Sequence, residues 1–358
     1  MVSILDDLEK IKSLDTEDML GIEENFYNQL IEAMKIAEGA DITKIKGRKF
    51  SGIAILGMGG SGFTGDIIKS LVMDEIDIPV EVVKSYQLPG FVSRSWLVLP
   101  VSYSGNTEET ISAVSQALER GCELLCVTSG GKIEEIARRY GKCLIKVPSG
   151  IQPRGASGYL FFSTYLVLAN LRIIKINKDH IEEALDLIKK KCALYKRDVQ
   201  TSKNYAKIIA AGIGNRLPVI YGTSGILSSV AFRWKCEFNE NSKFPSFWDE
   251  FPELNHNETV GWGKLKEITS KFVLIVFKDD AASDKIKVRI ETTLRLIKDN
   301  FYKIIEIPVE GKSKLAKALS TIYLGDIASV YLALLNGVNP TPVDKIVVLK
   351  AELAKLDK

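Results

Sequence analysis

Short apolar runs alternate with amphipathic stretches between residues 52 and 171, and this alternation constrains the fold more than any other feature of the sequence. Apolar runs predict strands at Gly52–Leu56, Val80–Val83, Trp96–Pro100, Glu123–Thr128 and Cys143–Lys146, and helical spacing predicts helices at 62–73, 107–119, 132–140 and 157–171. Continuous apolar strands that alternate with helices are typical of a parallel sheet covered on both faces. The sequence therefore predicts an α/β domain that ends near Ile176, preceded by helical structure over 6–40.

The second half of the chain repeats this plan. A strand at 218–221, the turn Gly222-Thr-Ser-Gly225 and a helix at 228–238 are followed by strands at 271–277 and 303–307, with a helix at 283–300 between them. Helices are also predicted at 314–336 and from 341 to the end, and a charged helical stretch over 178–211 bridges the two halves. We expect two doubly wound α/β domains, residues 1–176 and 177–358, that face each other across a ligand cleft.

Composition excludes several classes of function. The 48 basic and 45 acidic residues give a net charge of only +3 and form no dense basic block, so nucleic acid is not an expected partner. No stretch approaches 18 uninterrupted apolar residues, and the first residues do not resemble a leader, so a soluble cytoplasmic protein is expected, with no membrane partner. The five cysteines are scattered without metal-ligand spacing, and four lie in apolar runs typical of buried positions.

The stretch Gly57-Met-Gly-Gly-Ser-Gly62 joins a predicted strand to a predicted helix, as a dinucleotide-binding loop does. A dinucleotide site would need an acidic residue at the end of the second strand, where this chain has Lys84 and Ser85. No Lys-Ser/Thr pair follows the glycines, as a nucleoside-triphosphate loop requires. The glycine spacing by itself is weak, and the sequence argues against a dinucleotide.

A second loop of phosphate size follows the third strand. It places the hydroxyls of Ser102, Ser104 and Thr107 around a glycine, where a helix begins and its free N–H groups favour an anion. An ordinary helix cap would explain one of these hydroxyls, but not all of them together with a further Gly/Ser loop formed by Gly59, Gly60 and Ser61. Because both loops follow parallel strands at their carboxyl ends, the sequence predicts a site for a single phosphate, bound by neutral donors without a metal.

The stretch from Ser102 to Thr110 resembles the signature of sugar-isomerase (SIS) domains, which bind the phosphate of sugar phosphates. The chain as a whole resembles the bifunctional phosphoglucose/phosphomannose isomerases of archaea, which have tandem SIS domains and belong to the phosphoglucose isomerase superfamily. The resemblance covers nearly the full length and rests on residues 57–61, 102–110, 152–158, 233–243 and 251–258.

That resemblance implies an aldose–ketose isomerase that interconverts glucose 6-phosphate or mannose 6-phosphate with fructose 6-phosphate. The proton transfer would pass through a cis-enediolate, without a metal or other cofactor. Such chemistry needs a base that moves a proton between C1 and C2, and a cation that stabilises the enediolate. Glu240 matches the family's base and Arg154 its cation, while Glu237, three residues before Glu240, is the competing candidate for the base.

Histidine is scarce, with His180 on a charged helix start and His256 in a polar loop. The first is expected at the surface; by resemblance, the second would open the sugar ring in the active site of a neighbouring subunit, which implies a homodimer. A C-terminal lysine of the family matches Lys350, with Lys345 as the alternative. Thr341 is expected to cap the last helix, with Pro342 at its first position, before any catalytic role.

Two other functions remain open at this point. A related SIS enzyme could act on a different phosphosugar, such as an amino sugar or a pentose 5-phosphate. A sugar-phosphate sensor without catalysis would need a basic DNA-binding helix pair, which the acidic first 48 residues do not supply. The zinc class of phosphomannose isomerase needs a histidine-rich ligand set, and this chain has two histidines. The combination of Glu240, His256 and Arg154 favours the metal-free isomerase.

Overall fold

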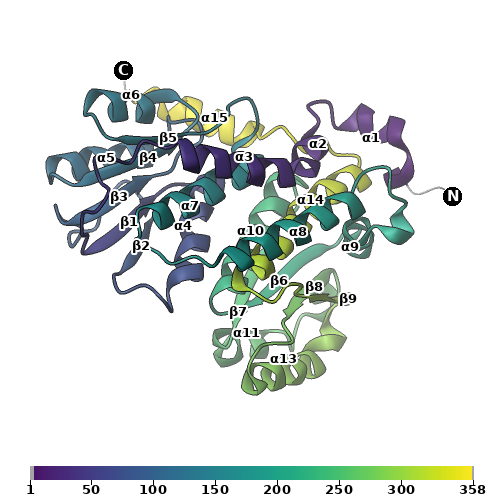
Figure 1. The fold of residues 1–358 in the computed structure, drawn as a ribbon. Coiled ribbons are helices and arrows are strands. Elements are labelled where there is room, and N and C mark those ends of the chain that lie inside the picture. Colours follow the sequence, from purple (N-terminus) through teal and green to yellow (C-terminus); the bar gives the residue numbers. More distant parts are fainter. Residues whose placement is uncertain (1–3, 357–358) are drawn as a thin grey trace.

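The computed structural model describes residues 4–356, and within them the chain forms two parallel β-sheets flanked by helices (Figure 1). Both faces of the central strands are covered, because Ile53 and Ile55 of the first sheet pack into one hydrophobic core while Ala54 and Leu56 pack into another. The predicted fold class is thus confirmed. The predicted domain boundary at residues 176–177 stays a prediction. The outermost residues of the two predicted domains, 1–3 and 357–358, lie outside the described chain.

The first sheet has the strand order β2-β1-β3-β4-β5. Its strands have the predicted bounds: β1 (Gly52–Leu56), β2 (Val80–Val83), β3 (Trp96–Pro100), β4 (Glu123–Thr128) and β5 (Cys143–Lys146). In register, Ile53 of β1 lies opposite Val80 of β2 and Leu97 of β3. The chain therefore leaves β1 and β3, which are neighbours, at the same edge of the sheet, and the connections after them diverge there.

The second sheet has the order β7-β6-β8-β9, formed by β6 (Leu217–Thr223), β7 (Phe247–Phe251), β8 (Phe272–Lys278) and β9 (Lys303–Pro308). Strand β7 was not among the predicted strands. It pairs in parallel with β6, Val219 opposite Phe247, and lies at the edge of the sheet. Its sequence, Phe-Trp-Asp-Glu-Phe, is short and carries charge, as edge strands commonly do, and so lacks the continuous apolar run by which the other strands are recognised.

The helices follow the predicted plan with two breaks. The helical stretch predicted over 6–40 is divided before Met19, where Asp18 caps a new helix by accepting a hydrogen bond from the N–H of Gly21. The Asp15 carboxylate also accepts hydrogen bonds from the N–H groups of Met19 and Leu20. The bridging stretch is divided by Asn204, which caps the helix that follows it. The α-helices are α1 (Leu8–Leu14), α2 (Met19–Glu24), α3 (Phe26–Gly39), α4 (Gly59–Val72), α5 (Glu108–Glu119), α6 (Gly131–Arg139), α7 (Ser163–Asn170), α8 (Lys178–Leu194), α9 (Tyr205–Ile213), α10 (Ile226–Glu240), α11 (Glu258–Gly261), α12 (Lys266–Thr269), α13 (Asp284–Ile297), α14 (Lys314–Leu335) and α15 (Asp344–Leu353).

Short helices of other types lie between these elements. The single-turn helices η2 (Pro153–Ala156) and η5 (Glu253–His256) carry predicted site residues, and the π-helical turn η3 (Gly158–Phe162) leads from η2 into α7. Three more 3₁₀ turns complete the described elements, namely η1 (Ile4–Asp6), η4 (Thr201–Lys203) and η6 (Lys298–Asn300).

Helix α14 is the central helix of the molecule. In the described chain it is the one helix whose length and hydropathy would allow it to cross a membrane, yet 94% of that apolar window is buried inside the protein. It packs beside α10, to which it is tied by an ion pair between Arg233 and Asp326. Its residues belong to a hydrophobic core that also includes residues of the first sheet, so α14 is a core helix (Figure 1).

The cysteines match their predicted role as small buried side chains. Cys122, Cys126, Cys143 and Cys192 are buried, and Cys236 is half-buried. All five are free thiols. Burial raises the pKa of the Cys126 thiol to about 12 and that of Cys236 to about 11, so both remain protonated at neutral pH.

Candidate functional site

Two polar loops meet at the carboxyl ends of β1 and β3. The backbone N–H of Tyr103 donates to the hydroxyl of Ser61 over 3.1 Å, which joins the two loops directly. Within the second loop, the hydroxyls of Ser102 and Thr107 lie 2.9 Å apart and share a hydrogen bond. Ser61 and Ser102 are buried, whereas Ser104 is exposed and accepts a hydrogen bond from the N–H of Asn106.

The helices that follow these loops begin without side-chain caps. Met58 precedes α4, and Thr107 precedes α5, and neither side chain bonds to the first N–H groups of its helix. Thr107 does occupy the cap position, but its hydroxyl turns to Ser102 instead. Two helix N-termini with free N–H groups, next to serine and threonine hydroxyls, can bind a single anion such as a phosphate.

Glycine brings the first loop against η2. A methyl group added to Gly60 would lie 3.0 Å from Cα of Arg154 and 3.2 Å from the carbonyl oxygen of Pro153. Gly59 has a φ of 52°, a conformation that L-residues with a side chain rarely adopt. The start of α4 therefore packs directly on the turn that carries Arg154, which brings the first loop next to the arginine.

Arg154 is buried and held from several sides. Its Nε donates to Oδ1 of Asn241 over 2.5 Å, and its Nη2 donates to the carbonyl oxygens of Pro340 and Thr341, each over 2.9 Å. The remaining nitrogen, Nη1, lies 3.6 Å from Oε2 of Glu240. The guanidinium therefore has a fixed orientation and directs its Nη1 toward the Glu240 carboxylate.

Behind Arg154 lies a buried polar chain. Nδ2 of Asn241 donates to Oε2 of Glu237 over 3.0 Å, and Oε1 of Glu237 lies 3.2 Å from Nη1 of Arg233. Arg233 in turn donates to the Asp326 carboxylate, from Nε to Oδ1 and from Nη2 to Oδ2, each over 2.8 Å. All of these side chains are buried, and they connect α10 to α14.

The two glutamates on α10 have different surroundings. Glu237 is 1% exposed, and burial, together with the nearby carboxylates of Asp326 and Glu240, raises its pKa to about 8 in spite of Arg233. The side chain of Glu240 is 28% exposed and faces Arg154. Glu240 can thus meet a small molecule at the site, while Glu237 is enclosed by protein.

Three features of the site were not singled out from the sequence. The first two are Asn241 and Lys243, which lie inside the stretch 233–243 that carried the family resemblance. Nζ of Lys243 donates to the carbonyl oxygen of Glu240 and to that of Pro340, the latter over 2.7 Å. Burial and the nearby Arg154 lower the pKa of Lys243 to about 8. The third is the ion pair between Arg233 and Asp326. Asp326 is the single acidic residue in the apolar stretch 315–334, and a buried carboxylate needs a partner, so the sequence did contain a signal for this pair.

Thr341 does not cap the last helix, so that prediction was wrong. Helix α15 begins at Asp344 and its cap position is Val343. The residue before a proline favours extended backbone, and Pro342 follows Thr341 directly, which delays the helix. The N–H of Thr341 instead donates to Oδ1 of Asn339 over 3.0 Å, and the buried Thr341 hydroxyl has no hydrogen-bond partner among residues 4–356.

The remaining predicted residues are exposed at the surface of the chain. His256 ends the short helix η5, after β7, and is exposed. Lys345 and Lys350 lie on α15, where every described residue from 344 to 350 is exposed. The structure therefore brings together Gly59, Gly60, Ser61, Ser102, Ser104, Thr107, Arg154, Glu240 and the carbonyl group of Thr341, and leaves the histidine and the two lysines at the surface.

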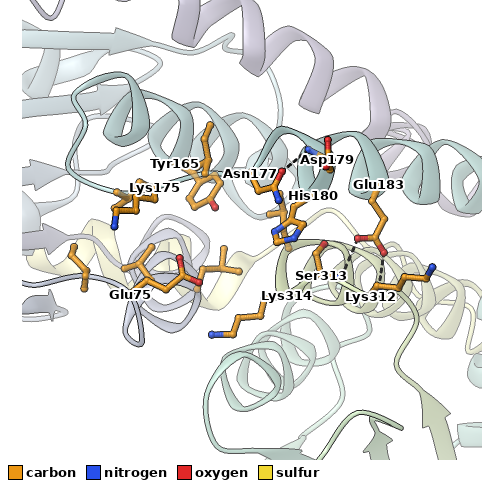
Figure 2. Close-up of a pocket in the computed structure, with 16 residues that line it drawn as sticks. Glu75, Tyr165, Lys175, Asn177, Asp179, His180, Glu183, Lys312, Ser313 and Lys314 are labelled. Atoms are coloured by element: carbon orange, nitrogen blue, oxygen red, sulfur yellow. Dashed lines mark hydrogen bonds between the residues drawn. The ribbon is translucent and has the colours of Figure 1, made fainter.

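A separate pocket of about 750 Å³ lies where α8 begins, between the end of α4 and the start of α14 (Figure 2). His180 lines this pocket and is exposed, as the sequence suggested for it. Glu183 faces the same region and accepts hydrogen bonds from the N–H groups of Lys312 and Ser313. The pocket is lined by different residues from those of the Arg154 cluster. Within residues 4–356, no group of three or more His, Cys, Asp and Glu side chains is arranged to hold a metal ion.

Comparison with known families identifies both halves of the chain. Residues 48–171 match the SIS domain, and residues 202–353 match the bacterial phospho-glucose isomerase C-terminal SIS domain. Both predicted site loops and Arg154 fall in the first match, and Glu240, His256 and α15 fall in the second.

Curated relatives align over most of their length. The bifunctional phosphoglucose/phosphomannose isomerase of Caldicellulosiruptor bescii is 39% identical over 93% of this chain and 99% of its own length, and that of Aquifex aeolicus is 38% identical over 95% and 99%. A relative with a different name, the D-glucosamine-6-phosphate 4-epimerase of Sulfolobus acidocaldarius, is 34% identical over 86% of this chain and 90% of its own.

Solved structures share the fold at low sequence identity. The tagatose-6-phosphate ketose/aldose isomerase of Escherichia coli superposes with a TM-score of 0.69 at 17% identity, covering 91% of this chain and 95% of that one. The C-terminal domain of the glucosamine-fructose-6-phosphate aminotransferase of Francisella tularensis gives a TM-score of 0.70 at 13% identity, covering 90% and 98%.

Proposed function

We propose that this chain, which belongs to the family of bifunctional phosphoglucose/phosphomannose isomerases, interconverts glucose 6-phosphate or mannose 6-phosphate with fructose 6-phosphate. The observation that carries this proposal is the pairing of a partly exposed carboxylate, Glu240, with the fixed guanidinium of Arg154, beside two loops suited to one phosphate. The reaction belongs to hexose phosphate metabolism, in glycolysis or gluconeogenesis, and we expect the protein in the cytoplasm.

The phosphate would bind at the two loops. The hydroxyls of Ser61, Ser102, Ser104 and Thr107 and the free N–H groups at the starts of α4 and α5 supply donors without a full positive charge. Because Gly60 packs on η2, a phosphate held there would place the sugar carbons toward Arg154 and Glu240. We infer no resident metal or other cofactor for this chemistry.

The proton transfer would use Glu240 as the base. Its carboxylate takes the proton from C2 of the open-chain aldose, the electron pair forms the double bond between C1 and C2, and the carbonyl oxygen at C1 gains the negative charge. Arg154 Nη1 faces this region and would stabilise that charge in the enediolate. The hydroxyl proton at C2 then moves to the oxygen at C1, Glu240 returns its own proton to C1, and the carbonyl group is left at C2, which gives the ketose.

Ring opening would need a second protein chain. His256 is exposed, and the segment that follows it exposes large apolar side chains, with Val260 82%, Leu265 71% and Ile268 54% exposed. Helix α15, which carries Lys350 and Lys345, likewise exposes Val347, Val348 and Leu349 by about three-fifths each. Apolar patches of this kind are typical of interfaces between subunits. We propose a homodimer in which these surfaces are covered and His256 reaches the neighbouring site, with Lys350 beside the sugar ring.

The test is isotope exchange on fructose 6-phosphate in D₂O with a chelator present. Nuclear magnetic resonance would follow the appearance of glucose and mannose 6-phosphates and of deuterium at their C2. Both products with solvent deuterium support the proposed dual activity without a metal. Absence of exchange, with sugar-phosphate binding still detected, would contradict it.

A second function is favoured by one relative. The protein from Sulfolobus acidocaldarius is named for epimerisation at C4 of glucosamine 6-phosphate. The same experiment with glucosamine 6-phosphate distinguishes the two functions, because inversion at C4 would yield galactosamine 6-phosphate, whereas aldose–ketose isomerisation leaves C4 unchanged.

A further inference from the structure

The orientation of Arg154 depends on one amide side chain. An arginine has five N–H groups. Those on Nη2 point to backbone carbonyls of residues 340 and 341, and that on Nε points to Oδ1 of Asn241 over 2.5 Å. This leaves Nη1, which lies 3.6 Å from Glu240, as the nitrogen that faces the site. The carbonyls hold one edge of the guanidinium, and Asn241 holds the other.

Asn241 is itself held in one orientation. Its Nδ2 donates to Oε2 of Glu237 over 3.0 Å and to Oγ of Ser329 over 2.9 Å. Because both donors of the amide are used in this way, the amide oxygen faces Arg154. Asn241 is fully buried, so water does not compete for these bonds.

We propose that Asn241 is a positioning residue that aims Nη1 of Arg154 at the reacting carbons, as one link of a buried chain that runs from Asp326 through Arg233 and Glu237. The inference deepens the proposed function and rests on it, since it gives a role to the side chain behind the proposed catalytic arginine. Asn241 does not itself contact the substrate site; it acts through Arg154.

Buried side chains also bind the backbone of η2, the turn that carries Arg154. Nη2 of Arg233 donates to the carbonyl oxygen of Arg154 over 2.9 Å, and Nε2 of Gln29 donates to the carbonyl oxygen of Gly155 over 2.8 Å. The backbone of η2 is therefore fixed independently of Asn241. Removal of the Asn241 side chain should release the Nε edge of the guanidinium, so that it can pivot about its bonds to the carbonyls of residues 340 and 341 while the turn stays in place.

The first variant is Asn241→Ala. Loss of the acceptor leaves Nε without its partner, and a misaimed catalytic group lowers kcat by about 100-fold. The KM for fructose 6-phosphate changes little, because the phosphate loops are untouched. The matched control is Asn239→Ala, the same residue type on the same helix end, whose Oδ1 accepts from the N–H of Ser246 rather than from Arg154. This control keeps wild-type kinetics.

The second variant, Asn241→Asp, tests the role by conservative rescue. The new carboxylate can still accept from Arg154 Nε, but it can no longer donate to Glu237. While Glu237 is protonated it can supply that proton itself, and the pKa of Glu237 is about 8 because of its burial. A second carboxylate beside Glu237 favours retention of that proton, so activity of Asn241→Asp should approach that of the wild type at low pH and fall once alkaline pH removes the proton.

Several charged groups face Glu237 and bear on this pH profile. Arg233 and Glu240 lie on its own helix, Asp326 on α14, Arg154 in η2, and Glu23 on α2. Burial raises the pKa of Glu23 well above its usual value, so both carboxyls can hold protons in this region. The pH dependence of activity is therefore measured for the wild type in parallel. The ratio of variant to wild-type activity at each pH removes the contribution of these groups, because the two proteins differ only at position 241.

A readout without turnover separates this proposal from the proposed function. The Nε–H of Arg154, buried and bonded to Asn241, should give a slowly exchanging signal in nitrogen-15 NMR, assigned by its disappearance in Arg154→Lys. Asn241→Ala should lose the slow exchange of this signal, and Asn239→Ala should keep it.

The kinetic and NMR results together support or overturn the positioning role of Asn241. A fall in kcat with rescue at low pH, and loss of the protected signal, support the positioning role. Unchanged kcat in a folded Asn241→Ala, or a protected signal that persists in it, overturns the role. If the wild type converts no sugar phosphate, the proposed function fails, and the NMR signal alone still supports or overturns the link between Asn241 and Arg154.

Discussion

Glu237 and Glu240 lie about one turn apart on α10, and their surroundings give the two carboxyl groups different chemistry. Glu237 is enclosed by Arg233, Asn241 and the Asp326 carboxylate, and its pKa of about 8 means that it carries a proton at pH 7. Glu240 is partly exposed at the end of the helix and faces Arg154. A base must reach its substrate, and only Glu240 has that access among these two.

The Glu240→Gln variant should lose isomerisation and keep sugar-phosphate binding. A glutamine has nearly the same shape but does not accept a proton at neutral pH, and removal of a general base costs about 10²- to 10⁴-fold in kcat. Initial rates with fructose 6-phosphate, together with binding by calorimetry, measure both quantities. Glu237→Gln should cost much less at pH 7, because it replaces a protonated acid by a neutral amide. Turnover retained in Glu240→Gln but lost in Glu237→Gln would move the base to Glu237.

The raised pKa of Glu237 should also make the free energy of unfolding depend on pH. Its ordinary value is 4.5 and its folded value is about 8, so between these pH values the folded state holds a proton that the unfolded state has released. The stability contributed by the protonated form is therefore complete below pH 4.5 and is lost as the pH rises toward 8. This loss amounts to at most about 1.4 kcal/mol for each pH unit.

Glu237→Gln removes this dependence and retains the neighbouring carboxyls. The stability of the variant relative to the wild type should therefore increase from pH 5 to pH 8, as measured by urea unfolding at a series of pH values. A constant difference across that range would show that Glu237 is ionised in the folded protein at neutral pH.

At the scale of elements, the contact between α4 and η2 joins the phosphate loops to the arginine. The absence of a side chain at Gly60 allows the start of α4 to approach the backbone of Arg154 and Pro153 closely. Neither α4 nor η2 contains the whole site. In the proposed function, their packing would set the distance between the phosphate and the reacting carbons.

Gly60→Ala should disturb that distance. Its methyl group would lie 3.0 Å from Cα of Arg154, so the backbone of η2 or α4 has to shift. Overpacking of this kind costs about 1–3 kcal/mol of stability, and it should raise KM and lower kcat together. Gly90→Ala is the matched control, because a methyl group there would meet no atom within 4 Å. Wild-type kinetics in Gly60→Ala would argue against a site that spans this contact.

At the scale of the whole molecule, one chain presents an incomplete set of the proposed catalytic groups. Arg154 and Glu240 lie next to each other, whereas His256 and the lysines of α15 are exposed. The proposed homodimer would complete each site with groups from both chains. Such an arrangement gives a strong test, because two inactive variants can repair each other.

Glu240→Gln and His256→Ala should each be inactive, and their mixture should recover activity. In a mixed dimer with two shared sites, one site contains both intact residues, so random mixing restores about a quarter of the wild-type rate. The two variants are unfolded and refolded together, and native mass spectrometry confirms the mixed dimers. Each variant refolded alone is the control. Mixed dimers without recovered activity would place His256 in its own chain's site or outside catalysis.

Local sequence patterns were enough to predict the strands of the first sheet and most helices of the chain. Continuous apolar runs such as Gly52–Leu56 and Trp96–Pro100 have the predicted bounds, because a strand buried on both faces leaves a local apolar signal. The loops after β1 and β3 were likewise recognisable, since their glycines and hydroxyls are local in the chain. Edge strand β7 lacks such a run and was missed.

The grouping of the polar residues depends on contacts between remote parts of the chain. Asn241, Arg154 and Pro340 come from distant parts of the chain, and their contacts depend on the packing of α10 and α14 against η2. The structure likewise turned Thr341 from an expected helix cap into a backbone acceptor for Arg154. Side-chain orientation, burial and the resulting pKa of Glu237 arise from neighbours that are remote in sequence, and for that physical reason no local pattern contains them.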